Sequence, residues 1–264
     1  MSREPGAGLR ASVERLGRRG ENFVAEIGAL WSFTARIVRS VVARPLRFRR
    51  FIDELHDVGV RSLPVIVVSG IAVGMVLGLQ GHNTLVRFGA EESLGAVVGL
   101  SLIRELGPVL TGLLVTGRAG SAIAAQIGSM VATEQLDGLR MMSVDPVHYV
   151  VLPKVSALLV AMPLLSALFI VLGLFGGYVV GVAWLGVDAG SYVSALEANV
   201  TWSEDVGPSL IKALVFGILV ALVATYRGFH AEPHAEGVSD ATTSTVVIGS
   251  VTILLVDYIL TALL

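Results

Sequence analysis

The stretch that decides the fold is the long apolar run VLPKVSALLVAMPLLSALFIVLGLFGGYVVGVAW at residues 151–184. About 20 helical residues cross a hydrocarbon core of roughly 30 Å, so this run is long enough to span a bilayer. Two interpretations are open from the sequence. The run forms either one tilted helix, kinked at Pro163 and extending beyond the bilayer, or two short spans that turn near Gly176 and Gly177.

The rest of the chain has the same character. Hydrophobic residues make up 54% of the 264 residues and charged residues only 15%, too little polar material to cover a soluble core. Further apolar stretches lie near residues 62–82, 94–117, 207–226 and 243–264. Lipid cannot satisfy an open backbone, and these segments are too uniformly apolar for barrel strands. The sequence therefore predicts an all-α integral membrane protein.

The distribution of charge predicts the topology. Twelve of the nineteen Lys and Arg residues fall within residues 1–61, so this end should stay in the cytoplasm. Five crossings place residues 185–206 outside, and this segment carries four acidic residues but no Lys or Arg. Six crossings would place it inside. We therefore expect five spans with an external C-terminus, divided into an N-terminal segment (1–50) and a membrane domain (51–264).

Residues 21–43 have the pattern of an amphipathic helix. Apolar side chains fall within an arc of about 140° when placed at 100° per residue. They are Phe23, Ile27, Leu30, Trp31, Ile37, Val38, Val41 and Val42, and they lie opposite Glu21, Ser32, Arg36 and Arg39. This pattern predicts a helix lying in the membrane interface, the alternative being a helix packed on a soluble core.

Two glycine ladders with a spacing of four residues occur in the first and third apolar stretches. They are Gly70, Gly74 and Gly78, and Gly173, Gly177 and Gly181. Each set lies on one helix face, where missing side chains allow another backbone to approach closely. We favour packing within the chain over packing between subunits.

Ionisable residues inside the spans are the candidate functional residues, because an unpaired charge in the bilayer is costly. Arg104 and Glu105 lie near the middle of the second span, just before Pro108, which frees one helix carbonyl for another partner. Adjacent helical residues point about 100° apart, so each needs its own partner. They form either ion pairs within the bundle or the polar lining of a cavity. Asp257 is a further candidate, whereas Lys212 is expected to snorkel at the outer end of its helix.

No catalytic or metal-binding motif is found. The chain has no G-x-S-x-G and no H-E-x-x-H, and the absence of cysteine excludes thiolate sites. The net charge of −2 argues against nucleic-acid binding. The only lysines are Lys154 and Lys212, and glycine precedes neither of them, so the chain has no Walker A loop. We expect neither a catalytic residue, a metal nor a cofactor in this chain, and energy must come from a partner or an ion gradient.

The segment between the second and third spans contains a helical pattern of its own. Glu134, Gln135, Asp137 and Arg140 alternate there with Leu136, Leu139, Met141 and Met142. A short cytoplasmic helix with carboxylates and a Leu/Met side suits docking into a groove of another protein. The alternative is a solvated connector.

Several of these runs together resemble the MlaE (YrbE) permease family. They are GMVLGLQG (74–81), SLIRELGPVLTGLLVTGRAG (101–120), SAIAAQIG (121–128), TEQLDGLRMMSVDP (133–146), ATTSTVV (241–247) and LLVDYILTALL (254–264). The resemblance covers roughly residues 51–264, whereas the first fifty residues match only in character. The family forms the membrane subunits of MCE-associated ABC transporters in the inner membrane of Gram-negative bacteria.

The resemblance implies a homodimer in which each chain has an interfacial helix, five spans and a cytoplasmic coupling helix. It also implies a separate ATPase that binds ATP and Mg, a hexameric periplasmic MCE protein and often a STAS-domain protein. The cargo would be phospholipid, moved between inner and outer membranes to maintain lipid asymmetry. Alternatives are transport of another lipid such as sterol, a non-transporting scaffold, and an intramembrane enzyme using Ser69 or Asp257.

With this function in view, two sets of site residues are predicted. Lipid should bind at the dimer interface in a cavity lined by spans one, two and five, with the contacts Leu77, Leu85, Phe88, Arg104, Glu105 and Leu106. Coupling to the ATPase should pass through Glu134, Gln135, Leu136, Asp137, Leu139 and Arg140, with both leucines seated in the ATPase.

Overall fold

The structure is a computed structural model that describes residue 25, residues 28–40 and residues 48–263. It divides the chain into two units, Met1–Pro45 and Leu46–Leu264. In the first unit, residues 28–40 are helical and include Trp31 and Val38 of the predicted apolar arc. Phe23, Ile27, Val41, Val42 and Glu21 lie outside the described residues.

The second unit consists of helices, and no strand occurs among its described residues. Five helical segments are long and apolar enough to cross a membrane, as the sequence predicts. They are Phe48–Phe88, Glu91–Ala132, Val147–Trp184, Trp202–Phe229 and Ala235–Leu263. We refer to them as spans one to five.

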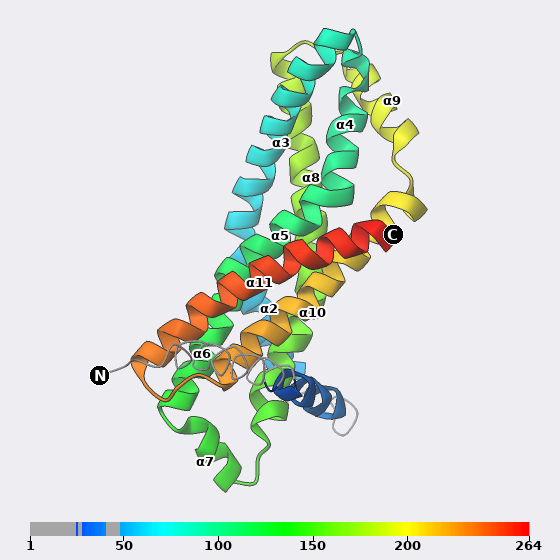
Figure 1. The fold of residues 1–264 in the computed structure, drawn as a ribbon. Coiled ribbons are helices and arrows are strands. Elements are labelled where there is room, and N and C mark those ends of the chain that lie inside the picture. The colour runs from blue at the N-terminus through cyan, green and yellow to red at the C-terminus, as the bar shows by residue number, and fades with distance from the viewer. Residues whose placement is uncertain (1–24, 26–27, 41–47, 264) are drawn as a thin grey trace, which may run out of the picture. The chain divides into compact units, whose positions relative to one another are not determined.

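Each span is built from one or more helices (Figure 1). Span one contains α2 (Phe48–Val58) and α3 (Leu63–Leu85), and span two contains α4 (Leu94–Ser101), α5 (Gly107–Val115) and α6 (Ser121–Ala132). Spans three, four and five contain α8 (Leu152–Tyr178), α10 (Gly207–Phe229) and α11 (Ala235–Leu263). The connecting helices are α7 (Gln135–Met141) and α9 (Ala189–Asn199).

The apolar run at 151–184 forms a single span. Its main helix, α8, runs without a break from Leu152 to Tyr178, with Pro163 inside it. The interpretation as one helix is therefore confirmed over two short spans. Helix α8 is also central to the packing of this unit, because α3 and α10 both lie along it (Figure 1).

The two glycine ladders pack against each other, which confirms the prediction of contact within the chain. A Cβ atom added to Gly74 of α3 would lie 1.9 Å from the carbonyl oxygen of Gly173 in α8. One added to Gly78 would lie 3.0 Å from the carbonyl oxygen of Gly177. Because only glycine allows such an approach, the two ladders fix how α3 and α8 lie against each other.

Span two is not a regular α-helix. Two π-helical turns interrupt it, at Leu102–Leu106 and at Thr116–Gly120. A π-helical turn is rare and occurs frequently at functional sites. The first of these turns carries Arg104 and Glu105 and ends two residues before Pro108, so the predicted polar residues lie where the helix departs from ideal geometry.

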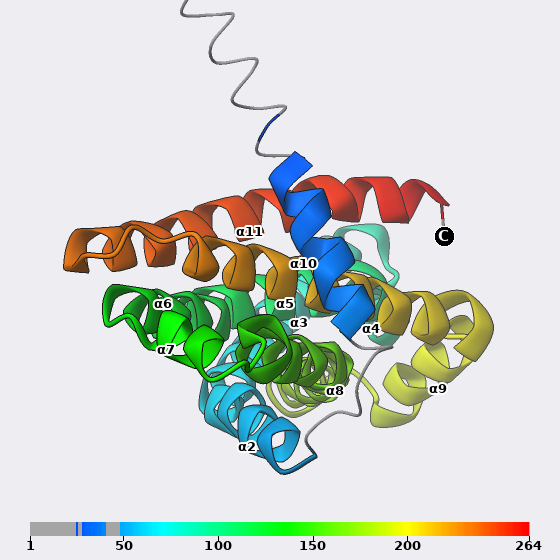
Figure 2. The ribbon, with the colours of Figure 1, turned by 90° about the horizontal axis from the view of Figure 1, so that it is seen from below.

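The two connecting helices lie at different places along this unit. Helix α7 follows α6 beyond the lower end of the spans, whereas α9 lies beside α4 (Figure 1). Tyr192 of α9 is 1% exposed, and its ring lies edge-on to Tyr178 with 5.5 Å between the centroids. Figure 2, seen from below, shows α7 close to the start of α8. Short helices thus join span two to span three and span three to span four.

Candidate functional site

Charged side chains from three different spans meet in one cluster inside the membrane domain. The charged cluster consists of Arg104, Glu105, Asp205, Lys212, Asp257 and Thr261. Span two contributes its first π-helical turn, span four its first residues, and span five its last turns. The cluster borders a cavity of about 510 Å³ that is also lined by Ser203, Glu204, Pro208 and Ser209.

The local sequence explains why the cluster starts at Arg104. Pro108 has no backbone N–H, so the carbonyl of Arg104, four residues earlier, loses its usual helical donor. The Nζ atom of Lys212 donates to this carbonyl oxygen at 2.9 Å. The prediction that the proline frees a carbonyl for another partner is therefore confirmed, and the partner is a lysine from span four.

Arg104 and Glu105 are not paired with each other, as predicted. Arg104 Nε donates to Asp205 Oδ1 at 2.5 Å. Asp205 is 1% exposed, and its second oxygen accepts from the backbone N–H of Thr201 at 2.6 Å. The Arg104 side chain is 52% exposed, so guanidinium N–H groups remain accessible beside the cavity.

Lys212 links the remaining members of the cluster. Its Nζ atom donates to Glu105 Oε1 at 3.0 Å and to Thr261 Oγ1 at 2.8 Å. Asp257 Oδ1 lies 3.6 Å from the same nitrogen. The prediction that Lys212 snorkels is wrong, because the residue is 3% exposed. A compact ammonium with three donors can donate to acceptors from different helices, here the Arg104 carbonyl, Glu105 and Thr261.

The arrangement gives the cavity a defined chemistry. Arg104 and Lys212 face the carboxylates of Glu105, Asp205 and Asp257, so cations and anions are interleaved. The cations are not equivalent, because Lys212 is buried whereas half of the Arg104 side chain is exposed. An accessible guanidinium can form a bidentate contact with a phosphate while Asp205 holds its Nε atom. The Glu105 side chain is 40% exposed and can change partners beside it.

The structure brings together only part of the predicted lipid site. Arg104 and Glu105 line the cavity, but Leu77, Leu85 and Phe88 do not. Leu77 and Leu85 belong to α3, and Phe88 follows that helix with its side chain 78% exposed. Within one chain, residues of spans two, four and five line this cavity, whereas the prediction named spans one, two and five. Leu106 is partly exposed on the same π-helical turn as Arg104.

The sequence analysis missed Asp205 and Thr261 and misjudged Lys212. Asp205 was counted among the charges of an external loop, although span four begins at Trp202. A signal was present, because an Arg and a Glu inside an apolar span each require an opposite charge. Lys212 and Asp257 are ionisable residues inside other apolar stretches, and Asp205 directly precedes one. Matching charges between spans would have found these partners.

The predicted coupling residues form a helical turn after α6. Glu134 has a φ of 58° and precedes α7, which contains Gln135, Asp137 and Arg140 with exposed side chains. Arg140 Nη1 donates to Asp137 Oδ1 at 2.6 Å. The short helix that the sequence predicts is present, with its polar residues accessible.

One part of the predicted coupling surface needs correction. Leu136 is 4% exposed and therefore packs inside the chain rather than pointing outward to a partner. Leu139 is only partly exposed, whereas Met141 and Met142 are 82% and 66% exposed. The most exposed apolar side chains of α7 and its C-terminal end are thus the two methionines, a flexible residue type that can adapt to another surface.

The chain is similar to known permeases over almost its whole length. The sequence profile of a family described as "Permease MlaE" matches residues 51–263. The chain is 46% identical over 254 residues to the "Intermembrane phospholipid transport system permease protein MlaE" of Haemophilus influenzae, covering 96% of this chain and 97% of the relative. It is 41% identical over 250 residues to a "Probable ABC transporter permease protein" of Rickettsia bellii, covering 94% and 95% of the two chains.

A more distant relative comes from a plant. The chain is 32% identical over 228 residues to the chloroplastic "Protein TRIGALACTOSYLDIACYLGLYCEROL 1" of Arabidopsis thaliana, covering 86% of this chain and 65% of the relative. The family match begins at Phe51, inside α2, and extends through span five. Its five candidate spans make the chain a multi-pass membrane protein. The chain belongs to the MlaE permease family.

Proposed function

We propose that this chain is the permease subunit of an ATP-driven transporter that moves phospholipid between the inner and outer membranes and so maintains outer-membrane lipid asymmetry. The observation that carries the proposal is the 46% identity, over 96% of this chain, to a permease named for intermembrane phospholipid transport. The charged cavity between spans two, four and five is compatible with this role, because a lipid phosphate needs a cation and the hydrocarbon core of a bilayer supplies none.

The proposed assembly follows the family resemblance. Two copies of the chain form a homodimer in the bacterial inner membrane and bind a separate ABC ATPase, which holds ATP and Mg. A hexameric MCE protein lies on the periplasmic side, and a STAS-domain protein binds the ATPase. The concentration of arginine in residues 1–61 supports a cytoplasmic N-terminus, and five spans then give a periplasmic C-terminus.

Within this assembly, the cavity would hold the lipid headgroup. The accessible guanidinium of Arg104 would contact the phosphate, while Asp205 fixes the orientation of Arg104 through its Nε atom. Glu105 would change partners as the lipid enters, because its contacts to Lys212 and Thr261 lie at the edge of the cavity. The acyl chains would lie at the dimer interface against Leu77, Leu85, Phe88 and Leu106.

Energy would enter through α7 and the turn before it. Glu134, Gln135, Asp137 and Arg140 present charge and hydrogen-bonding groups to the ATPase, and Met141 and Met142 replace the leucines as apolar contacts. Helix α7 follows span two after a turn at Thr133 and Glu134, so movement of α7 would act directly on span two.

Reconstitution of the permease with its ATPase and MCE partners tests the lipid site. Arg104→Ala and Glu105→Ala should each reduce ATP-dependent lipid transfer between vesicles about tenfold or more, because each removes one member of a partly buried pair. Arg87→Ala and Glu197→Ala are matched controls, since both residues are exposed and lie outside the charged cluster. Parental transfer rates in both cluster variants would contradict the proposed site.

Glu134→Lys tests the coupling assignment separately. The variant should fold normally, because Glu134 is exposed, but should bind the ATPase more weakly or hydrolyse ATP without moving lipid. Glu197→Lys on α9 is the control, because it makes the same charge change elsewhere on the surface. Unchanged ATPase recruitment and transport in Glu134→Lys would remove this assignment. A photoreactive residue at Leu77 or Phe88 tests the acyl wall by forming lipid adducts.

A further inference from the structure

Helix α2 is attached to its neighbours by a row of polar contacts on one face. Arg50, Glu54 and Asp57 follow one another at spacings of four and three residues, so they lie along the same side of the helix. Arg50 lies over the ring of Tyr149, with 3.5 Å between its Cζ atom and the ring centroid. Arg118 of span two donates to the carbonyl oxygen of Asp57 at 2.6 Å. The middle contact, through Glu54, is made by a buried lysine.

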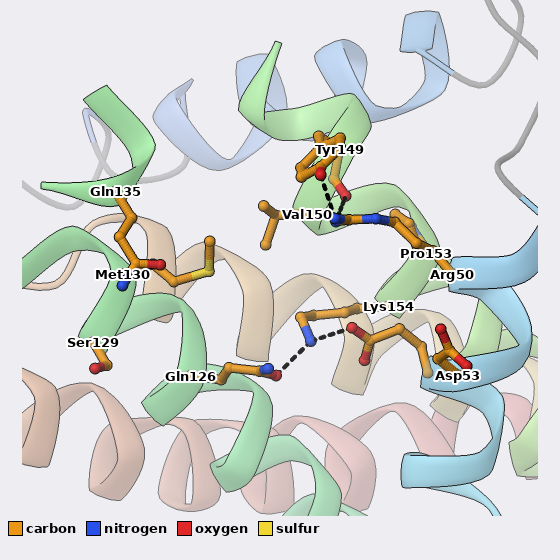
Figure 3. A pocket seen from close by; sticks show the side chains of 11 residues that line it. Arg50, Asp53, Gln126, Ser129, Met130, Gln135, Tyr149, Val150, Pro153 and Lys154 are labelled. Atoms are coloured by element: carbon orange, nitrogen blue, oxygen red, sulfur yellow. Dashed lines mark hydrogen bonds and ion pairs between the residues drawn. The ribbon is translucent and has the colours of Figure 1, made fainter. Parts of the chain in front are cut away.

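This lysine, Lys154, lies in the first turn of α8 and is 2% exposed. Its Nζ atom donates to Glu54 Oε1 of α2 at 2.6 Å and to Gln126 Oε1 of α6 at 2.5 Å. Figure 3 shows the lysine between Gln126 on one side and α2 on the other. A buried ammonium requires such acceptors, because the charge is costly to bury without them. One side chain therefore joins three helices.

The three helices lead to different parts of the membrane domain. Helix α2 continues through a short turn into α3 of span one, α6 leads to α7, and α8 forms span three. A cavity of about 590 Å³ adjoins Lys154 and is lined by residues of all three helices. Gln135, the first residue of α7, also lines it. A displacement of α7 thus reaches the site where α2, α6 and α8 are joined.

The cavity also distinguishes this joint from a close-packed core contact. The glycine ladders leave no space between α3 and α8, so those helices must move together. At Lys154, by contrast, the polar groups border open volume, and partners can be exchanged without a steric clash. This polar joint is therefore a connection between α2 of span one and the α6–α7 segment that has room to move.

We propose that Lys154 is a positioning residue that transmits movement of the α6–α7 segment to α2 and span one, and so couples ATP hydrolysis to lipid movement. The inference rests on the proposed function, because it takes α7 as the point where the ATPase acts. Lys154 itself touches neither lipid nor nucleotide. Its role is to keep α2 attached to α6 and α8 while they move.

The test uses the complete reconstituted transporter and measures ATP hydrolysis and lipid transfer in the same proteoliposomes. Lys154→Met should leave hydrolysis within about twofold of the parent but reduce lipids moved per ATP about tenfold, since the charge-assisted contacts are lost. Lys154→Arg should restore part of this ratio, because it keeps the charge and the adjoining cavity has room for the larger cation, although a planar guanidinium reaches the two acceptors less well. Arg49→Met is the control, because it removes an exposed cation from α2, the helix that Lys154 contacts through Glu54.

The outcomes separate this inference from the proposed function. A parental complex that moves no lipid in an ATP-dependent way overturns the proposed function and this inference with it. If the parental complex transports lipid and Lys154→Met moves the same number of lipids per ATP, the inference alone is overturned. A loss of stability, hydrolysis and transfer in parallel in Lys154→Met also overturns the inference alone. If Lys154→Met does not assemble, Glu54→Gln decides, because it keeps Lys154 bonded to Gln126 and weakens only the contact to α2. An unchanged ratio in Glu54→Gln overturns the inference, and a reduced ratio supports it.

Discussion

Replacing Gly74 by alanine should destabilise the membrane domain more than any ordinary methyl addition. The added Cβ atom would lie 1.9 Å from the carbonyl oxygen, 2.6 Å from the carbonyl carbon and 2.7 Å from the Cα atom of Gly173. All three are backbone atoms, so no change of rotamer relieves the clash. An ordinary contact begins at 3.4 Å, so α3 and α8 must separate locally by about 1.5 Å.

The cost follows from this separation. Overpacking a close-packed site typically costs about 1–3 kcal/mol, and the lost contacts of neighbouring glycines place Gly74→Ala at the upper end of this range. Gly117→Ala is the matched control, because a Cβ atom there has nothing within 4 Å. In a helix this control should gain about 0.5–1 kcal/mol from the lower conformational freedom of the unfolded chain.

Reversible unfolding in mixed detergent micelles measures both changes. We expect the two variants to differ by at least about 2 kcal/mol in the free energy of unfolding. Gly70→Ala and Gly78→Ala should cost less than Gly74→Ala, because their added atoms would lie 3.1 Å and 3.0 Å from the opposite carbonyl oxygens. Equal stability of Gly74→Ala and Gly117→Ala would refute the reasoning, since the close approach would then carry no energetic weight.

Three further predictions follow from buried polar groups. Burial raises the pKa of Tyr192 to about 12 from 10.0, so the folded chain keeps a proton that the unfolded chain loses as the pH rises. The free energy of unfolding should therefore fall by about 2–3 kcal/mol between pH 10 and 12, and Tyr192→Phe should remove this loss. The same alkaline unfolding curve for the parent and Tyr192→Phe would contradict this prediction. Arg104→Ala should lower the free energy of unfolding by about 3–5 kcal/mol, because it leaves the buried charge of Asp205 unpaired. Asp205→Ala should lower it clearly less, because the Arg104 side chain that remains is half exposed. A larger loss in Asp205→Ala than in Arg104→Ala would be inconsistent with the geometry. Pro108→Ala supplies an N–H to the Arg104 carbonyl, so it should reduce the cost of Lys212→Met by about 1 kcal/mol in a double-mutant cycle, and strict additivity would exclude this.

The sequence predicts the features that depend on local pattern. Five apolar stretches become five candidate spans because length and hydropathy decide whether a helix can cross a bilayer. The glycine ladders pack together because a sequence spacing of four residues puts their members on one helix face. Pro108 frees a carbonyl because its missing N–H is a covalent property. None of these predictions requires knowledge of which helices are neighbours.

The partners of the charged residues depend on the neighbours and therefore could not be predicted in the same way. Whether Lys212 snorkels or is buried depends on where the end of span five lies, since Thr261 and Asp257 approach it from there. From hydropathy alone, a lysine near the end of a span is expected to extend its ammonium group into water. Leu136 is a similar case, because a helix as short as α7 has too few turns for its period to define a buried face.

The placement of lysine and arginine connects the two polar sites. Seventeen of the nineteen basic residues are arginines, and the two lysines are both buried, at 2% and 3% exposure. A buried cation at the junction of three helices must reach acceptors in different directions, which a compact ammonium on a flexible stem does better than a planar guanidinium. Lys154 joins α2, α6 and α8, and Lys212 of span four joins spans two and five. Both sites involve span two, so under the proposed coupling a displacement of α7 would pass the Lys154 joint before it reached the π-helical turn that carries Arg104. In the proposed mechanism, coupling at α7 and lipid contact at Arg104 would therefore be connected through the same interrupted helix, span two.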